Sequence, residues 1–316
     1  MANEKREKKI PTGVKRKSLI LGTAILLATA FIILIALFIL MTSLLPSFTG
    51  QCVAVVDLNM PLSVEGQPMT LFETGYPGSA EIANYIEQLD EREDVGSVLF
   101  IVNSGGGSVV ASDEIYNAVK GVEKPKVAYF REVAASGAYY VSSGTDYIIS
   151  EPNALTGNIG VVAMVISMGG LFDKLGINAT AITSGDHKDI GSPYRNMSEE
   201  EYQIMQSIVD EIFEEFRNVV IENRGNKLNM PRFNEITDGR IMTGRQALEV
   251  GLVDEVGNMD YALMKAAELG GIEAESPADV RVCYVEMIPQ EGGLFSAESF
   301  IGSITEKFQT ATLRYQ

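Results

Sequence analysis

The sequence is poor in residues that cross-link a chain or shuttle protons: it has two cysteines, one histidine and no tryptophan among 316 residues. Two cysteines exclude a disulfide-dense scaffold and a zinc site made of cysteine alone. Cys52 and Cys283 both lie in apolar, strand-like runs, so we interpret them as buried free thiols. A single bridge between them is the second interpretation. Any histidine-dependent chemistry has to use His187.

Basic residues are scarce beyond the first 17 positions. Residues 1–17 carry seven basic and two acidic side chains, whereas the rest of the chain carries 18 basic and 40 acidic ones, a net charge of −22. So acidic a body is a poor partner for nucleic acid, whose affinity comes mainly from phosphate neutralisation. It is also poorly suited to bind an anionic coenzyme over a broad surface. The composition therefore predicts no nucleic-acid partner.

The longest hydrophobic run lies near the amino terminus. Residues 19–41 are 23 consecutive positions without a charge, long enough for a helix to cross a bilayer. The basic residues before this run predict a cytoplasmic amino terminus. A cleaved signal peptide is the alternative, although its apolar region is typically only about 7–15 residues long. We therefore expect a single-pass protein of the cell membrane. Residues 1–17 would form a cytoplasmic segment and residues 18–45 a transmembrane signal anchor. One extracytoplasmic domain would cover 46–316, with its last strand and tail over 279–316.

Short apolar runs alternate with amphipathic segments along the rest of the chain. Strands are predicted over 52–58, 97–102, 126–130, 147–150, 159–166 and 280–288. Helices are predicted over 80–92 and 108–121, from residue 134 onward, over 198–224 and over 245–250. Short strands that alternate with helices predict parallel βαβ units and an α/β fold.

Ser136 lies among small residues at a predicted strand-to-helix junction, in Val133-Ala-Ala-Ser-Gly-Ala-Tyr-Tyr140. Free N–H groups at a helix start can hold a developing oxyanion, and small neighbours leave room for a substrate carbonyl. A serine in such a run is more often a helix cap or a packing choice. The Gly-x-Ser-x-Gly elbow of the α/β-hydrolases is absent, since Ala134 and Ala138 replace both glycines. Ser136 is therefore one candidate nucleophile.

Lys188 lies further along, in the polar loop Ser184-Gly-Asp-His-Lys-Asp-Ile-Gly-Ser-Pro193. A lysine acts as a base only as a neutral amine, which requires a dry site, and most lysines are instead solvated at the surface. His187 is the competing base, in a Ser–His–Asp arrangement with Asp186 or Asp189, and chemistry alone favours histidine. Adjacent residues of an extended loop point in opposite directions, so both bases do not readily face one serine.

Asn103-Ser-Gly-Gly-Gly-Ser108 forms a second strand-to-helix junction. Glycine-rich turns after strands often bind phosphate, but this run lacks the Lys-Ser/Thr of a P-loop and the Gly-x-Gly-x-x-Gly spacing. A turn that merely needs positive φ explains the glycines equally well. If Ser136 is a nucleophile, the candidate oxyanion donors are the backbone N–H groups of Gly106 or Gly107 on one side and of Gly137 on the other.

Four segments, in this order, resemble the signal peptide peptidase A family of serine proteases in its short, single-copy form: VNSGGGSVVASDEI, VAASGAYYVSSGTDYIISEPNALTGNIGVV, SGDHKDIGSPYRNMSEEE and GRIMTGRQALEVGLVDEVG. They cover most of residues 97–270. The resemblance implies a Clp-protease/crotonase-like fold with a parallel βαβ superhelical core. It also implies a Ser-Lys dyad, in which Ser136 is the nucleophile, Lys188 is the general base and His187 is a bystander.

Two positions depart from the family's pattern. Gly105 stands where the family usually has a proline after Asn-Ser, so the turn with the oxyanion donors is more flexible here. Asn158 stands in Thr156-Gly-Asn-Ile-Gly160 where the family has a serine that helps to hold the lysine. The resemblance therefore makes Asn158 the residue that would orient Lys188, through its side-chain oxygen.

The resemblance implies a membrane-anchored endopeptidase that degrades remnant signal peptides and other short or unfolded polypeptides, next to small or apolar residues. It implies no metal and no cofactor. It also implies a homo-oligomeric ring or dome, in which Ser136 and Lys188 can come from adjacent copies. One alternative is a catalytically silent membrane scaffold or peptide-binding module, which the change at Asn158 favours. Another is a crotonase-like acyl-CoA enzyme, which the acidic body disfavours.

Overall fold

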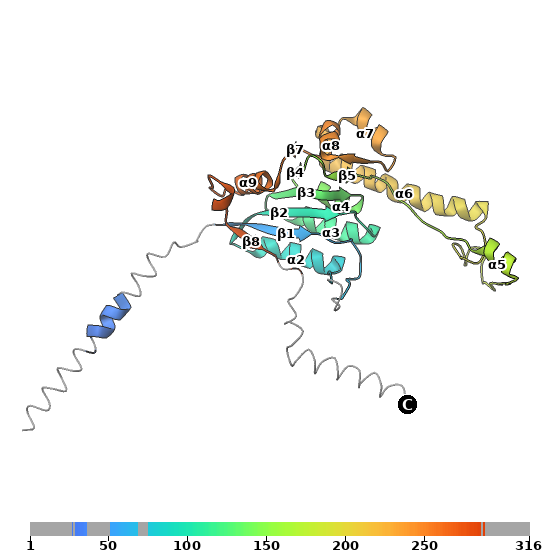
Figure 1. Ribbon diagram of the computed structural model, residues 1–316, viewed down its shortest axis with the longest axis horizontal. Coiled ribbons are helices and arrows are strands. Elements are labelled where there is room, and N and C mark those ends of the chain that lie inside the picture. Colours follow the sequence, from blue (N-terminus) through green and yellow to red (C-terminus); the bar gives the residue numbers. More distant parts are fainter. Residues whose placement is uncertain (1–26, 28, 37–50, 69–74, 286, 288–316) are drawn as a thin grey trace, which may run out of the picture. The chain divides into compact units, whose positions relative to one another are not determined.

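The computed structural model describes residues 27, 29–36, 51–68, 75–285 and 287 (Figure 1). The chain divides into two units, Met1–Thr49 and Gly50–Gln316. Residues 29–36 are helical, and none of the described helices is long and apolar enough to cross a membrane, so the predicted transmembrane helix finds no support in them. Most of the predicted anchor over 18–45 lies outside the described residues, as do the basic segment 1–17 and residues 288–316.

An eight-stranded, mostly parallel sheet lies at the centre of the second unit, as the predicted α/β class requires. Its main path runs β6-β5-β3-β2-β1-β8, while β4 pairs with β3 and β7. Only the pair of β5 and β6 is antiparallel. The strands are β1 Cys52–Leu58, β2 Val95–Ser104, β3 Lys126–Ala135, β4 Tyr147–Ser150, β5 Leu155–Gly157, β6 Ile241–Thr243, β7 Glu255–Val256 and β8 Val282–Tyr284.

Helices connect these strands and cover the sheet. They are α2 Ser79–Glu91, α3 Val109–Gly121, α4 Gly137–Ser143, α5 Gly169–Leu175, α6 Glu199–Arg224, α7 Met230–Ile236, α8 Gly244–Val250 and α9 Met259–Leu269, with short 3-10 turns at Gly225–Lys227 and Pro277–Asp279. The predicted helices correspond to α2, α3, α4, α6 and α8. The short α5 and α7, and also α9, lie in segments for which we predict no helix.

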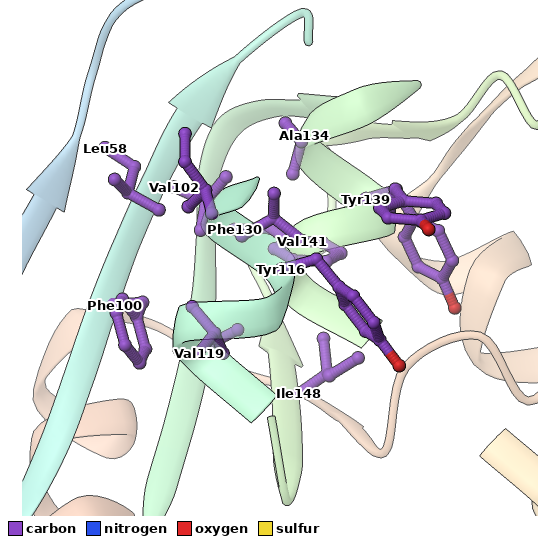
Figure 2. Close-up of a cluster of buried hydrophobic side chains, with 14 of the residues drawn as sticks. Leu58, Phe100, Val102, Tyr116, Val119, Phe130, Ala134, Tyr139, Val141 and Ile148 are labelled. Carbon is purple, nitrogen blue, oxygen red and sulfur yellow. The ribbon is translucent and has the colours of Figure 1, made fainter. Parts of the chain in front are cut away.

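Both faces of the sheet are buried under apolar clusters. Strands such as β1 contribute to both clusters, since successive side chains of a strand point to opposite faces. In β1, Cys52, Ala54 and Val56 join one apolar cluster, whereas Val53 and Val55 join the other. The second cluster is covered by a stripe of alanines on α9. Figure 2 shows part of the first cluster, where strand residues pack against α3 and α4: Leu58, Phe100, Val102, Phe130, Tyr116, Val119, Tyr139 and Val141.

The pairing of β2 with β3 brings two strand-to-helix turns side by side. The register shifts between Val102 and Ser104, so that β3 bulges opposite this point. Asn103 spans the irregularity, since its Oδ1 accepts a hydrogen bond from the N–H of Val133 at 3.2 Å. At this carboxyl edge β2 leads into the glycine-rich turn and β3 ends next to Ser136.

Residues 161–198, which we call the arm, include no buried residue. The arm contains α5 and leads to the amino end of α6, away from the sheet (Figure 1). The predicted strand over 159–166 is wrong, because residues 158–166 are irregular and those from 162 onward are exposed. A short apolar run alone does not separate a buried strand from an exposed apolar segment.

Cys52 and Cys283 form a disulfide with Cα atoms 5.9 Å apart, so the interpretation as free thiols is wrong. Strands β1 and β8 are parallel neighbours, and this pairing brings into bonding range two cysteines that lie 231 positions apart. Such a long-range strand pairing has no signature in composition or spacing. Strand β8 is also shorter than the predicted 280–288.

Candidate active site

Ser136 follows β3 directly and is the N-cap residue of α4, with a backbone φ of +53° and ψ of −127°. L-residues rarely adopt this conformation, which costs on the order of 1–3 kcal/mol. Two hydrogen bonds of 3.0 Å hold it: the N–H of Ser136 donates to Gly157 O, and the N–H of Tyr140 donates to Ser136 O. The hydroxyl makes no capping hydrogen bond and is partly exposed, so it is free to react.

The glycine-rich turn packs directly against the turn at Ser136. A Cβ on Gly106, whose φ is +88°, would lie 2.5 Å from the amide nitrogen of Gly137. A Cβ on Gly137 would lie 2.2 Å from Ser112 Oγ. Only residues without a Cβ allow this close approach of the two backbones.

The three predicted oxyanion donors differ in their hydrogen bonding. The N–H of Gly106 donates to Ser104 Oγ at 3.2 Å. Neither the N–H of Gly107 nor that of Gly137 has an acceptor within the described part of the chain. Gly107 and Gly137 line the same cavity as Ser136. These two N–H groups are therefore available to a ligand, whereas that of Gly106 is engaged.

Asn158 lies beside Ser136 because β5 pairs with β3, with Gly157 opposite Ala135. Its φ is also +53°, and Ser136 and Asn158 are the only residues other than glycine with positive φ among those the structure describes. The Asn158 Nδ2 donates to Gly239 O at 2.6 Å, which fixes the amide. Its Oδ1 has no partner in the described residues, so it remains free to accept a hydrogen bond.

Ser136, Asn158 and the two free N–H groups line a cavity of about 520 Å³, a volume typical of ligand-binding clefts. Its other walls come from α3, α4, the start of the arm, α6 and the loop after α7. They are mainly apolar or acidic: Val109, Val161, Val162, Val209, Ile212, Phe213, Phe216, Tyr140, Asp113, Asp210, Glu215 and Asp238. None of the lysines and arginines that the structure describes lines this cavity. We predict the apolar stripe of α6 from its helical spacing, but not its place in the site.

Tyr140 closes one side of the cavity, with its hydroxyl donating to Asp113 Oδ1 at 3.2 Å. Burial, and then the negative charge of Asp113, raise the pKa of Tyr140, so the phenol stays protonated at neutral pH. It packs edge-to-face against Phe216, with ring centroids 5.2 Å apart, and thereby joins α4 to α6.

The two candidate bases do not meet Ser136 within one chain. Lys188 is exposed on the arm and is not among the residues that line the cavity. His187 lies next to it and is also exposed, with Nε2 3.6 Å from Glu200 Oε1. Within the described residues the cavity thus holds the serine, the N–H groups and Asn158, but neither base.

The parallel sheet and its paired strand-to-helix turns define the class of the protein, an α/β fold of the Clp-protease type, and residues 77–156 match the Clp protease family. Residues 118–273 match Peptidase family S49. The chain belongs to this family of serine peptidases.

Individual relatives agree with this assignment. A protein of Methanocaldococcus jannaschii named as a protease is 35% identical over 260 residues, which are 77% of this chain and 83% of the relative. An Enterococcus faecium protein that bears the name signal peptide peptidase SppA is 38% identical over 56% of this chain and 52% of its own length. The chloroplastic serine protease SPPA of Arabidopsis thaliana is 30% identical over 72% of this chain, but over only 34% of the plant protein.

Proposed function

We propose that this serine peptidase is a membrane-anchored endopeptidase in which Ser136 is the nucleophile and Lys188 of an adjacent copy is the general base. The observation that carries the proposal is the turn at Ser136. A strained serine with a free hydroxyl faces a cavity together with the unpaired N–H groups of Gly107 and Gly137. Nucleophile and oxyanion donors are the parts that acyl transfer to serine requires.

In the proposed reaction, Ser136 Oγ attacks the scissile carbonyl carbon while its proton passes to the neutral amine of Lys188. The N–H groups of Gly107 and Gly137 hold the oxyanion. The protonated lysine then donates a proton to the leaving amine as the C–N bond breaks. The same lysine, neutral again, takes a proton from a water molecule that attacks the acyl carbon. It returns that proton to Ser136 Oγ as the bond between Oγ and the acyl carbon breaks and the second product leaves.

The separation of Lys188 from Ser136 supports a base supplied by a second copy. The arm carries large apolar side chains that are widely exposed in the single chain, such as Val162 at 84%, Met164 at 82% and Ile182 at 98%. Apolar surface of this extent is typical of an interface with another protein. Burial at such an interface would also desolvate Lys188 and favour its neutral form. The free Asn158 Oδ1 could then accept a hydrogen bond from the lysine, which is the orienting role we expect for it.

The chemistry of the cavity and the names of the relatives support peptides as substrates. Apolar walls from α6 fit small or apolar side chains next to the scissile bond. Remnant signal peptides, which are apolar and released in the membrane, are the substrates we propose, together with other short or unfolded polypeptides. The 23 uncharged positions near the amino terminus support anchoring, with the peptidase unit outside the cytoplasm.

Cleavage of a fluorogenic peptide with small apolar residues before the scissile bond tests the proposal. The purified full-length wild type is compared with Ser136→Ala, Lys188→Ala and His187→Gln, each checked for native assembly. We expect Ser136→Ala and Lys188→Ala to lower kcat by about 10⁴-fold or more, and His187→Gln to stay within about twofold. Activity lost with His187→Gln and retained with Lys188→Ala would contradict the assigned base.

A catalytically silent scaffold is the second candidate function, favoured because neither Lys188 nor His187 is among the described residues that line the cavity of the single chain. A natively assembled wild type that cleaves no peptide, yet binds one with an affinity that Ser136→Ala leaves unchanged, would favour it.

A further inference from the structure

Short-range backbone hydrogen bonds shape the loop around Lys188. The N–H of Lys188 donates to Gly185 O at 3.1 Å, that of Ile190 to His187 O at 3.2 Å, and that of Ser192 to Asp189 O at 3.0 Å. All three bonds stay within the loop, which has no buried residue. The position of the amine relative to the rest of the molecule must therefore depend on other contacts.

Arg195 makes the strongest of these contacts. Its Nε and Nη2 bind the carboxylate of Asp189, the residue after Lys188, at 2.9 and 2.7 Å. Its Nη1 and Nη2 also bind the carboxylate of Glu201, at 2.7 and 2.5 Å. One planar guanidinium thus bridges the lysine loop to the first turn of α6, with two hydrogen bonds to each carboxylate.

Glu201 is a firm anchor for this bridge. It is only 2% exposed, and it forms a capping box with Ser198 at the start of α6. Arg195 holds the pKa of Asp189 below its usual range and lowers that of Glu201 to about 2, so both carboxylates are ionised at neutral pH. Arg195 therefore forms an ion pair with each of the two carboxylates at neutral pH.

Helix α6 continues the connection to the catalytic turn. Its carboxyl half is buried through Phe216, Val220 and Arg224, and Phe216 packs on Tyr140 of α4, whose N-cap is Ser136. Lys188 is thus tied, through Asp189, Arg195 and α6, to the helix that carries the serine of the same chain.

We infer that Arg195 is a positioning residue that fixes Lys188 for use by the Ser136 of a neighbouring copy, an inference that rests on the proposed function. A general base must come within about 2.6–3.2 Å of the proton that it removes. A displacement of about 1 Å can cost on the order of 10²-fold in rate. An exposed loop needs an external anchor to meet this demand, and Arg195 supplies it without touching the reacting atoms.

Steady-state kinetics give the first test. We expect Arg195→Gln to lower kcat by about 10- to 100-fold with little change in KM, because the base is misplaced while the cavity is intact. Arg195→Lys should lower kcat less than Arg195→Gln does, since lysine keeps the positive charge but cannot make two hydrogen bonds to each carboxylate. Arg232→Gln is the matched control and should leave kcat unchanged, because Arg232 of α7 only forms an exposed ion pair of 2.7 Å with Glu249 of α8.

The decisive test places Arg195→Gln in one chain of a mixed assembly. Full-length Ser136→Ala and Lys188→Ala chains with different tags are co-expressed and purified through both tags. Restored activity requires the lysine of the Ser136→Ala chain and the serine of the Lys188→Ala chain. When Arg195→Gln is added to the Ser136→Ala chain, which donates the lysine, we expect this activity to fall at least about tenfold. When Arg195→Gln is added instead to the Lys188→Ala chain, which donates the serine, we expect little effect.

The outcomes separate the shared dyad from the positioning role of Arg195. An inactive Ser136→Ala/Lys188→Ala assembly, with Arg195 intact in both chains, would contradict the shared dyad of the proposed function and with it this inference. An active assembly in which Arg195→Gln has no effect on either chain, or the same effect on both, would overturn the positioning role alone. Equal loss on both chains would identify Arg195 as a general structural residue.

Discussion

The turn at Ser136 concentrates backbone strain at one residue, because a φ of +53° with ψ of −127° suits glycine better than any L-residue. Glycine would relieve this strain, so a serine at this position supports the role that we propose for its hydroxyl. Strain held in place by neighbouring hydrogen bonds is common in catalytic turns, where it fixes the reactive atom.

We predict that Ser136→Gly is more stable than Ser136→Ala by about 1 kcal/mol, although both are inactive. Alanine keeps the strained Cβ, whereas glycine adopts the positive φ freely, and this gain exceeds its extra entropy in the unfolded chain. Urea unfolding of the two variants measures the difference. An alanine variant as stable as the glycine variant would show that the turn relaxes and stores no strain.

Gly137→Ala tests the close packing of Gly137 against α3. The added Cβ would meet Ser112 Oγ at 2.2 Å, so we expect a loss of about 1–3 kcal/mol of stability and a strong loss of activity as the N–H donors move apart. Gly121→Ala is the matched control, because a Cβ there meets nothing within 4 Å. Full peptidase activity in Gly137→Ala would contradict the assignment of its N–H to the oxyanion.

Sequence reasoning reached the residues of this turn but not all of its geometry. Strand-to-helix junctions predict that Ser136 and the glycine-rich turn share one edge of the sheet, because parallel strands end together. The positive φ of Asn158 and the engaged N–H of Gly106 depend on individual hydrogen bonds, which no residue pattern reports.

At the scale of elements, α6 is anchored to the sheet at its carboxyl end by a buried ion pair. Arg224 binds Asp254 through two hydrogen bonds of 2.9 and 3.0 Å, and the side chains are 1% and 8% exposed. Lys227 adds a contact of 2.8 Å to the same carboxylate. Burial alone raises the pKa of Asp254, but the hydrogen bonds and charge of Arg224 and Lys227 outweigh it, and the net pKa lies below the usual range.

We predict that Asp254→Asn lowers the free energy of unfolding at neutral pH by about 3 kcal/mol, because it leaves Arg224 buried without its counter-charge. A carboxyl group whose pKa is depressed in the folded state adds stability above its unfolded pKa of about 3.9 and loses it as pH falls through the folded value. Asp254→Asn should therefore lose less additional stability on acidification than the wild type does.

Chemical unfolding at neutral pH and at successively lower pH measures both effects. Glu249→Gln is the control, since its ion pair with Arg232 is exposed and should contribute less than about 1 kcal/mol. An acid dependence identical in wild type and Asp254→Asn would contradict the assigned role of the pair.

Local signals predicted some elements well and others poorly. The Ser198-Glu-Glu-Glu201 start of α6 is evident from capping chemistry, and the capping box is present. The run over 159–166 does not form the predicted strand: Ile159 is buried, but the residues from Val162 to Ile166 are exposed on the arm. An apolar run indicates that its side chains avoid water. It does not indicate whether a surface of the same chain or of another chain covers them.

At the scale of the whole molecule, the disulfide joins β1, the first strand of the described sheet, to β8, the last. It closes a loop of 231 positions, and loops of this size constrain the unfolded chain strongly. The bond also fits our proposal that this unit lies outside the cytoplasm, where disulfides persist.

We predict that Cys52→Ser/Cys283→Ser lowers the free energy of unfolding by about 2–5 kcal/mol. Guanidinium unfolding with and without a reductant measures it: the reductant should destabilise the wild type and leave the double variant unchanged. A wild type that is insensitive to reductant under unfolding conditions would show that the bond contributes nothing to stability.

Activation of Ser136 by Lys188 of a neighbouring copy involves two chains, and a single sequence does not show how copies meet. The most direct measurement is mass-spectrometric mapping of a fluorophosphonate adduct, which forms as Ser136 Oγ bonds to phosphorus and fluoride leaves. We expect the adduct on Ser136 in the wild type, none in Lys188→Ala assembled alone, and its return on the Ser136 of Lys188→Ala chains once these are co-assembled with Ser136→Ala. Labelling that stays absent in the mixed assembly, or that persists in Lys188→Ala alone, would contradict a serine activated by the lysine of its neighbour.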